Sequence, residues 1–170
     1  MEIIDIMERD EIAKGCTIEV KRCGNMSPII YKLTNNNIEI AELEFENNFK
    51  RKQAFYKTSD SKFELKNDLI MAKHQKQVLQ QGVELARLET NIMGRKGYII
   101  TRWKHRYKYE LGFGWRPKTV VKREVGNQEI FNVITDYKKH RVITVNPTTT
   151  ELQEVHILLS ITLFHLVLLG

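Results

Sequence analysis

The chain has 170 residues, a formal net charge of +6 and 42% hydrophobic residues, which suits one domain with a substantial core. A sequence pI of about 9.3 permits an acidic partner such as nucleic acid or anionic lipid, but does not require one. Cys16 and Cys23 fit neither a disulfide framework nor a metal-ligand spacing, and the first residues lack the basic start and apolar run of a signal peptide. We therefore expect a cytoplasmic protein.

From Thr17 onwards, apolar and polar residues alternate in short runs that turn-forming residues separate. Residues 17–22 form the first expected strand, and the sequence TNNN at residues 34–37 favours a tight turn with left-handed backbone conformations. The alternation then changes phase near Ala41, which predicts a β-bulge there. Further strands are expected at about 28–33, 37–46, 50–57, 61–66, 69–79, 83–90, 96–103, 105–112, 115–124, 127–135 and 138–146.

A pattern recurs every 45 residues. The run IEIAELE at residues 38–44 matches VELARLE at 83–89, and QEIFNVI at 128–134 is a weaker third copy. A fixed period of this length indicates repeated supersecondary units, and three units are too few for a β-propeller. We therefore expect repeats that close into one barrel. They lie near residues 28–66, 69–112 and 115–146.

The last part of the chain, residues 150–169, is expected to be a helix that is apolar on every side. Such a helix is buried in a protein or in a membrane. Its longest unbroken apolar run is only Leu166–Leu169, which favours a core helix over a membrane anchor. Thr148 and Glu151 have the spacing of a capping box. A barrel of about twelve strands cannot fill its interior with strand side chains alone, so we expect this helix to fill it.

The expected fold is thus mainly β, a closed antiparallel barrel of about twelve strands around a buried C-terminal helix. Residues 1–24 are interpreted as an N-terminal lead-in with one strand, and residues 25–170 as the barrel. Three side chains of the helix should be almost fully buried: Leu159, Leu163 and Phe164.

This architecture, with strand-rich repeats before the sequence HILLSITLFHLVLL, resembles the Tubby C-terminal-like superfamily, which includes LURP-one-related proteins and phospholipid scramblases. The resemblance covers about residues 25–170. It implies a non-enzymatic barrel that in some members docks to anionic membrane lipid. No residue of the family's lipid or calcium sites can be mapped onto this chain.

Basic residues recur at the start of the third strand of each expected repeat. An up-and-down connection would place them at one end of the barrel, where they would form an anion-recognising rim for lipid headgroups or phosphate. The alternative interpretation is a set of solvated hairpin ends that keep the barrel soluble. The candidate ligand-binding residues are Lys50, Arg51, Arg95, Lys96, Lys104, Arg106, Lys139 and Arg141.

We identify no catalytic residues, no cofactor motif and no metal site in the sequence. His156 and His165 are expected to be hydrogen-bonded core histidines, and the segment Gly112–Trp115 a tight turn. Trp103 and Trp115 are expected in barrel or rim positions, although an exposed one could lie at a membrane interface.

The leading hypothesis is a cytoplasmic protein, peripheral at the membrane, that binds an anionic ligand or a phospholipid surface. One rival is a small-molecule carrier or hydrolase with a pocket above about 300 Å³ at the barrel mouth. The other is a nucleic-acid-binding module, with Tyr107, Tyr109 and Trp115 as candidate stacking residues.

Strand direction also predicts where the helix ends. The last strand should finish away from the basic end, so the helix must return through the barrel and end at the basic end. Some of the basic residues there should lie close to the Gly170 carboxylate: Lys50, Arg51, Arg95, Lys96, Lys139 or Arg141. There its free carbonyls and the Gly170 carboxylate would need positive partners.

Overall fold

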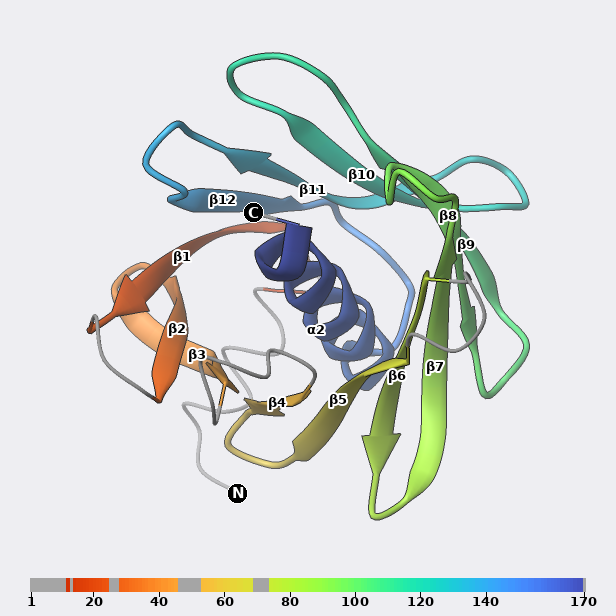
Figure 1. The fold of residues 1–170 in the computed structure, drawn as a ribbon, viewed down its shortest axis with the longest axis horizontal. Helices are drawn as coiled ribbons and strands as arrows, with labels where there is room; N and C mark the ends of the chain where they lie inside the picture. Colours follow the sequence, from red (N-terminus) through yellow and green to blue (C-terminus); the bar gives the residue numbers. More distant parts are fainter. Residues whose placement is uncertain (1–11, 13, 25–27, 46–52, 69–73, 170) are drawn as a thin grey trace.

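The computed structural model describes residues 12, 14–24, 28–45, 53–68 and 74–169, and over this part of the chain twelve antiparallel strands form a closed barrel around one long helix (Figure 1). This confirms the predicted fold class. The strands are β1 (Cys16–Cys23), β2 (Ile29–Asn35), β3 (Ile38–Phe45), β4 (Gln53–Lys57), β5 (Lys62–Asp68), β6 (His74–Gln80), β7 (Val83–Thr90), β8 (Lys96–Thr101), β9 (Arg106–Leu111), β10 (Lys118–Arg123), β11 (Glu129–Thr135) and β12 (Arg141–Val145). The helix is α2 (Leu152–Leu169).

The barrel is closed by its first strand. β1 pairs with β2 on one side and with β12 on the other, and every other strand pairs with its neighbours in the sequence. Ile18 and Val20 point inward from β1 and are buried. The barrel therefore includes β1, the strand expected at residues 17–22 as one of about twelve. The physical reason is that β1 supplies the hydrogen bonds that remove both sheet edges.

Three β-bulges occur at matching positions of the recurring sequence pattern. In each case one residue is left out of the strand pairing: Ile40, Leu85 and Ile130, which are 45 residues apart. The first of these is the bulge predicted near Ala41. The turns that precede them are also equivalent. Residues 36–37, 81–82 and 126–127 all have positive φ, the conformation that the Asn-rich turn predicts.

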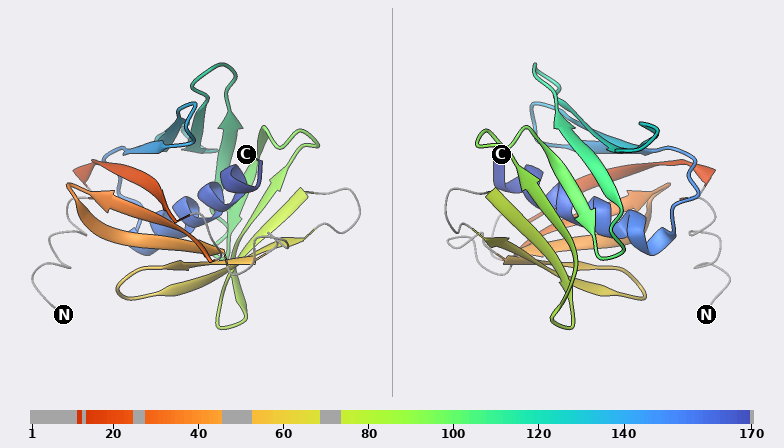
Figure 2. Two further views of the ribbon diagram at one scale, coloured as in Figure 1. Left: turned by 60° about the vertical axis from the view of Figure 1, so that its left-hand side comes forward. Right: turned by 90° about the vertical axis from the view of Figure 1, so that its right-hand side faces the viewer.

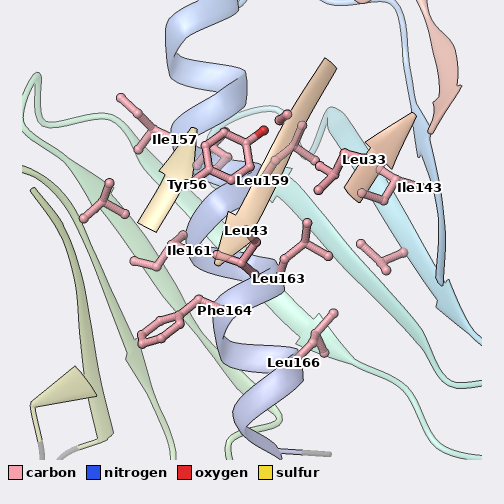
Figure 3. Close-up of a cluster of buried hydrophobic side chains, with 14 of the residues drawn as sticks. Leu33, Leu43, Tyr56, Ile143, Ile157, Leu159, Ile161, Leu163, Phe164 and Leu166 are labelled. Atoms are coloured by element: carbon pink, nitrogen blue, oxygen red, sulfur yellow. The ribbon is translucent and has the colours of Figure 1, made fainter. Parts of the chain in front are cut away.

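The helix α2 forms the centre of the core. All residues from Glu154 to Val167 are buried, and Leu159, Leu163 and Phe164 have no exposed surface, as predicted (Figure 3). The ring of Phe164 stacks on Phe45 of β3, with centroids 5.7 Å apart. The helix is long and apolar enough to cross a membrane, but 78% of it is buried inside the barrel.

The predicted capping box at the start of α2 does not form. The helix begins at Leu152, one residue after Glu151, so Thr148 lies too far upstream to cap it. The hydroxyl of Thr148 instead accepts a hydrogen bond from the backbone N–H of Thr150 at 3.1 Å, a local turn that competes with capping.

We name the two ends of the barrel by the helix: α2 begins at the entry end and finishes at the exit end. At the entry end, where α2 begins, Glu154 contacts His105 in the turn between β8 and β9. At the exit end, where α2 finishes, His165 Nε2 donates a hydrogen bond of 2.8 Å to the carbonyl of Gly94, between β7 and β8. The exit end carries the described turns 91–95, 112–117 and 136–140, which lie on the same side as the C label in Figure 2.

The predicted helix direction is therefore confirmed, because α2 finishes beside the turn that carries Arg95. The predicted contact between basic residues and the Gly170 carboxylate lies outside the described residues.

Candidate functional site

The predicted basic residues do not gather at one end. Arg95, Lys96, Lys139 and Arg141 belong to the exit end, whereas Lys104 and Arg106 lie at the entry end, between β8 and β9. The described pairs at equivalent repeat positions therefore share one end, as expected, whereas the further cluster with Lys104 and Arg106 lies at the other end. In an up-and-down barrel, successive turns alternate between the two ends, and residues 102–105 come one strand after residues 91–95. The candidates Lys50 and Arg51 lie outside the described residues.

Arg95 joins two turns of the exit end to each other. Its guanidinium lies 4.0 Å from the ring centroid of Phe113, and its Nη1 donates a hydrogen bond of 3.1 Å to the carbonyl of Gly112. Its own carbonyl accepts a bond of 2.7 Å from the backbone of Leu111. The side chain that the sequence suggests as a ligand contact thus fixes the turn 112–117 against the turn 91–95.

Arg141 is buried rather than displayed at the rim. Only 4% of the residue is exposed, because it shares the inward parity of Ile143 and Val145 in β12. Its Nη1 donates to the carbonyl of Lys139 at 3.3 Å, and its Nε has no hydrogen-bond partner in the structure. Burial lowers the pKa of the guanidinium, and the hydroxyl of Tyr31 acts in the opposite direction. No carboxylate of the described residues compensates this charge.

A cavity of about 350 Å³ opens beside the turn that precedes Arg141. It is lined by Lys21, Arg22, Tyr31, Lys138, Lys139 and His140. Among the described lining residues none carries a carboxylate, and Nε2 of His140 is a buried nitrogen without a hydrogen-bond partner. The lining is therefore mainly basic, although Lys21 forms an ion pair with Glu19 at 3.3 Å.

Large apolar side chains project from the three described turns of the exit end. We call them the tip residues: Ile92, Met93, Phe113, Trp115 and Tyr137. Trp115 is the most exposed, at 92%. Its neighbours Arg116 and Lys118 are also exposed, as are Lys138 and Lys139 beside Tyr137. Aromatic and basic side chains thus alternate on the same surface.

The entry end has a different construction, because its buried carboxylate is paired. Oε1 of Glu154 accepts a bond of 2.8 Å from His105 Nδ1 and one of 2.9 Å from the Tyr107 hydroxyl. Burial, together with Glu154, raises the pKa of Tyr107. Arg123 hydrogen-bonds to Thr150 just before α2. This network attaches the start of the helix to β9 and β10.

The two core histidines are hydrogen-bonded, as expected. Nδ1 of His156 lies 2.7 Å from the hydroxyl of Tyr56 on β4, and His165 bonds Gly94. His156 also lines a second cavity, of about 340 Å³, at the entry end. The other described residues around this cavity are Ile12, Ile40, Thr58, Ser59, Asp60, Ser61, Phe63, Leu152 and Gln153.

The aromatic residues could be only partly placed from the sequence. Tyr107 and Tyr109 are buried, since they share the inward parity of β9, and cannot stack on nucleic acid bases. Trp115 occupies the predicted turn and is 92% exposed, so of the two expectations for it the exposed position at the rim applies. Its position between Gly114 and Pro117, in a short turn that joins two strands, is the signal for its exposure.

Comparison with known proteins gives a likeness of fold. No family model matches the chain, and no curated protein matches it. Among solved structures, it is similar to a protein from Arabidopsis thaliana, AT5G01750, with a TM-score of 0.56 and 12% sequence identity over 88% of this chain and 90% of that chain. At this identity, the similarity shows that the two chains share a fold.

Proposed function

We propose that the protein is a non-enzymatic barrel that docks to anionic phospholipid membranes through its exit end. The observation that carries the proposal is the set of tip residues, which stand exposed among basic side chains on three neighbouring turns. This refines the anion-binding hypothesis by placing the contact surface at one end. The resemblance to Tubby-like and LURP-one-related barrels, and the shared fold with the Arabidopsis protein, are compatible with it.

The chemistry of the tip residues suits the boundary of a bilayer. Tryptophan and tyrosine are enriched at this boundary because they have an apolar ring and a polar atom. Trp115 and Phe113 on one turn and Ile92 and Met93 on another contribute apolar area that the barrel does not use for its own core. Exposed apolar patches of this kind mark interaction sites.

The basic side chains supply the attraction to anionic headgroups. Each Lys or Arg close to an anionic surface contributes about 1 kcal/mol. Arg116, Lys118, Lys138 and Lys139 are exposed next to the tip residues and can act together. The contact between Arg95 and Phe113 holds two of the turns in a fixed arrangement, which lowers the entropy lost on docking.

Liposome sedimentation tests this proposal. Wild-type protein should bind vesicles that contain phosphatidylserine, bind less in high salt, and bind weakly to pure phosphatidylcholine. The Phe113→Ser/Trp115→Ser and Arg116→Glu/Lys118→Glu variants should each lose most of this binding, while their unfolding midpoints stay unchanged.

A matched control is available at the entry end. Arg102 and Lys104 are exposed and basic, so Arg102→Glu/Lys104→Glu makes the same change in net charge. This control should retain binding. Equal loss in the control and the exit-end variant would show that total charge, rather than the exit end, governs binding.

A second candidate function rests on the cavity at the entry end. Its volume of about 340 Å³ reaches the range of small-molecule sites, and it has both apolar and hydroxyl-bearing walls. Because His156 is already bonded to Tyr56, the site suits a carrier better than a hydrolase. Small amphiphilic ligands should then raise the unfolding temperature of the wild type, and Ile40→Trp, which fills the cavity, should remove that shift.

A further inference from the structure

The cavity at the entry end has an apolar side and a polar side. Its apolar side consists of Ile12, Ile40, Phe63 and Leu152, of which the first three are buried in the core. With a volume of about 340 Å³, the cavity can enclose a short hydrocarbon chain. A ligand with such a chain would bury it against the apolar side, and the polar side would then select the head group of the ligand.

The polar side is the turn between β4 and β5, at residues 58–61. Oγ1 of Thr58 accepts hydrogen bonds from the backbone N–H groups of Asp60, at 3.3 Å, and Ser61, at 3.0 Å. The backbone N–H of Thr58 donates to the carbonyl of Ser61 at 2.9 Å. The hydroxyl of Ser59 donates to Oδ1 of Asp60 at 3.2 Å. These bonds hold three hydroxyls and one carboxylate in a fixed arrangement along the cavity.

The charge of this cavity differs from that of the rest of the protein. Among its described lining residues, Asp60 carries a carboxylate and no Lys or Arg is present. Lys57 and Lys62, on either side of the turn, have the outward parity of β4 and β5. Lys57 pairs with a carboxylate of β3 at 2.6 Å, and Lys62 lies 4.4 Å from the centroid of an aromatic ring of β4. The formal charge of the lining is thus opposite in sign to the net charge of +6.

From this arrangement we propose that the cavity binds an aliphatic primary amine, with its ammonium group at the turn 58–61 and its chain against the apolar side. An ammonium has three N–H donors and no acceptor, which matches the Asp60 carboxylate and the neighbouring hydroxyl oxygens. A carboxylate has about four lone-pair sites, so Asp60 can accept this bond together with the one from Ser59. The inference rests on the second candidate function, the carrier, and is independent of the membrane proposal.

Two other head groups fit the cavity less well. A fatty acid would place a second negative charge beside Asp60, and the described lining offers no Lys or Arg to compensate it. The start of α2 does not supply this compensation, because its first turn already contains the carboxylate of Glu154. An alcohol would fit the hydroxyls of the turn but would form no ion pair with Asp60.

Isothermal titration with probes of equal chain length tests the head group. Octylamine should bind the wild type more than about tenfold more tightly than octanoate, and severalfold more tightly than octanol. This order opposes the net charge of the protein, which favours octanoate at nonspecific sites. Hexylamine should bind roughly tenfold more weakly than octylamine, because each buried methylene strengthens binding about fourfold.

The Asp60→Asn variant tests the carboxylate while it preserves the shape of the side chain. Its Oδ1 can still accept the bond from Ser59, so the turn should keep its structure. This variant should bind octylamine no more tightly than octanol. The matched control is Glu110→Gln, which makes the same change in net charge at an exposed residue of β9 outside this cavity. Loss of the amine preference in the control would overturn the assignment, because it would show an effect of total charge.

The Ile40→Trp variant separates this inference from the carrier function. It fills the cavity and should abolish the binding of octylamine and octanol alike. Octylamine binding that survives in this variant would place the amine elsewhere on the protein and overturn the assignment. Wild-type protein that binds octanol or octanoate as tightly as octylamine would leave the carrier function standing and overturn the amine preference. An amine preference that persists in Asp60→Asn would overturn it as well. Binding of none of the probes would contradict both the carrier function and this inference.

Discussion

The two ends of the barrel handle charge in opposite ways. At the entry end, Glu154 accepts hydrogen bonds from His105 and Tyr107, and Arg106 pairs with Glu124 at 2.8 Å. At the exit end, Arg141 is buried without a carboxylate, and Trp115 and its neighbours face solvent. The paired groups of the entry end stabilise the fold. The exposed side chains of the exit end, such as Trp115, are held in place by the fold but do not contribute to its stability. The exit end is therefore the surface through which we propose that the protein contacts a membrane.

The largest expected effect concerns the helix that connects the two ends. Leu163 has no exposed surface and lies midway along the core. The Leu163→Ala substitution should lower the free energy of unfolding by about 2–5 kcal/mol, through lost burial and the cavity that it leaves. Urea denaturation measures this effect. A loss below about 1 kcal/mol would mean that the barrel does not depend on its helix.

The next effect tests the paired chemistry of the entry end. In the Glu154→Ala variant, the buried hydroxyl of Tyr107 loses its acceptor, which should cost about 1–3 kcal/mol of unfolding free energy. The control Gln153→Ala removes an exposed side chain from the adjacent helix position and should change stability by less than about 0.5 kcal/mol. Equal effects of the two substitutions would contradict the structural role of Glu154.

A pH-dependent effect should come from Lys76, inside the barrel. Burial lowers its pKa from the ordinary 10.5 to about 8. Between these values the unfolded chain binds more protons than the folded one, so the contribution of Lys76 to stability rises with pH. Lys76→Met should therefore be more stable than the wild type by roughly 2 kcal/mol at pH 7, and the difference should shrink towards pH 10.

Urea denaturation of both proteins at pH 7 and pH 9.5 measures this difference. The comparison stops below pH 10 because burial also raises the pKa of Tyr56 and Tyr109, and these groups lower stability once the tyrosines of the unfolded chain ionise. A constant difference between the two proteins across this range would show that Lys76 is not desolvated in the folded state.

The smallest expected effect on stability belongs to the exit end. Trp115 is 92% exposed, so Trp115→Ala should change the unfolding free energy by less than about 0.5 kcal/mol. The same substitution should change the tryptophan fluorescence response to anionic vesicles, because Trp103 alone would remain as a reporter. A clear loss of stability would mean that Trp115 packs within the protein and is not available to a membrane.

Much of the fold could be predicted from the sequence because its signals are local. Alternation indicates strands, the phase change near Ala41 indicates a bulge, and the apolar segment after Pro147 indicates a core helix. The period of 45 residues also led to the correct direction of α2. The prediction of a capping box was wrong, because Thr148 accepts a hydrogen bond within its own turn instead of capping the helix.

The candidate site was harder to predict because a basic residue in the sequence does not reveal which face it occupies. Arg141 has the parity of Ile143, and this alternation could have indicated that it points inward. The role of Arg95 could not be predicted in this way, since it depends on a contact with Phe113 across two turns. Likewise, Lys104 and Arg106 follow Arg95 and Lys96 closely in the sequence, but successive turns alternate between the two ends. They therefore lie at the entry end, whereas Arg95 and Lys96 lie at the exit end.

The position of α2 after all twelve strands has a consequence for how the chain folds. On the ribosome, the strands emerge before the helix that fills their interior, and at about 5–20 residues per second they wait at least a second for it. The contacts that complete the core span long separations, 100 residues from Tyr56 to His156 and 71 from Gly94 to His165. Such distant contacts slow folding. Until α2 arrives, Leu33 and Leu43 have no helix to pack against, and a nascent chain in this state exposes apolar strands that favour aggregation.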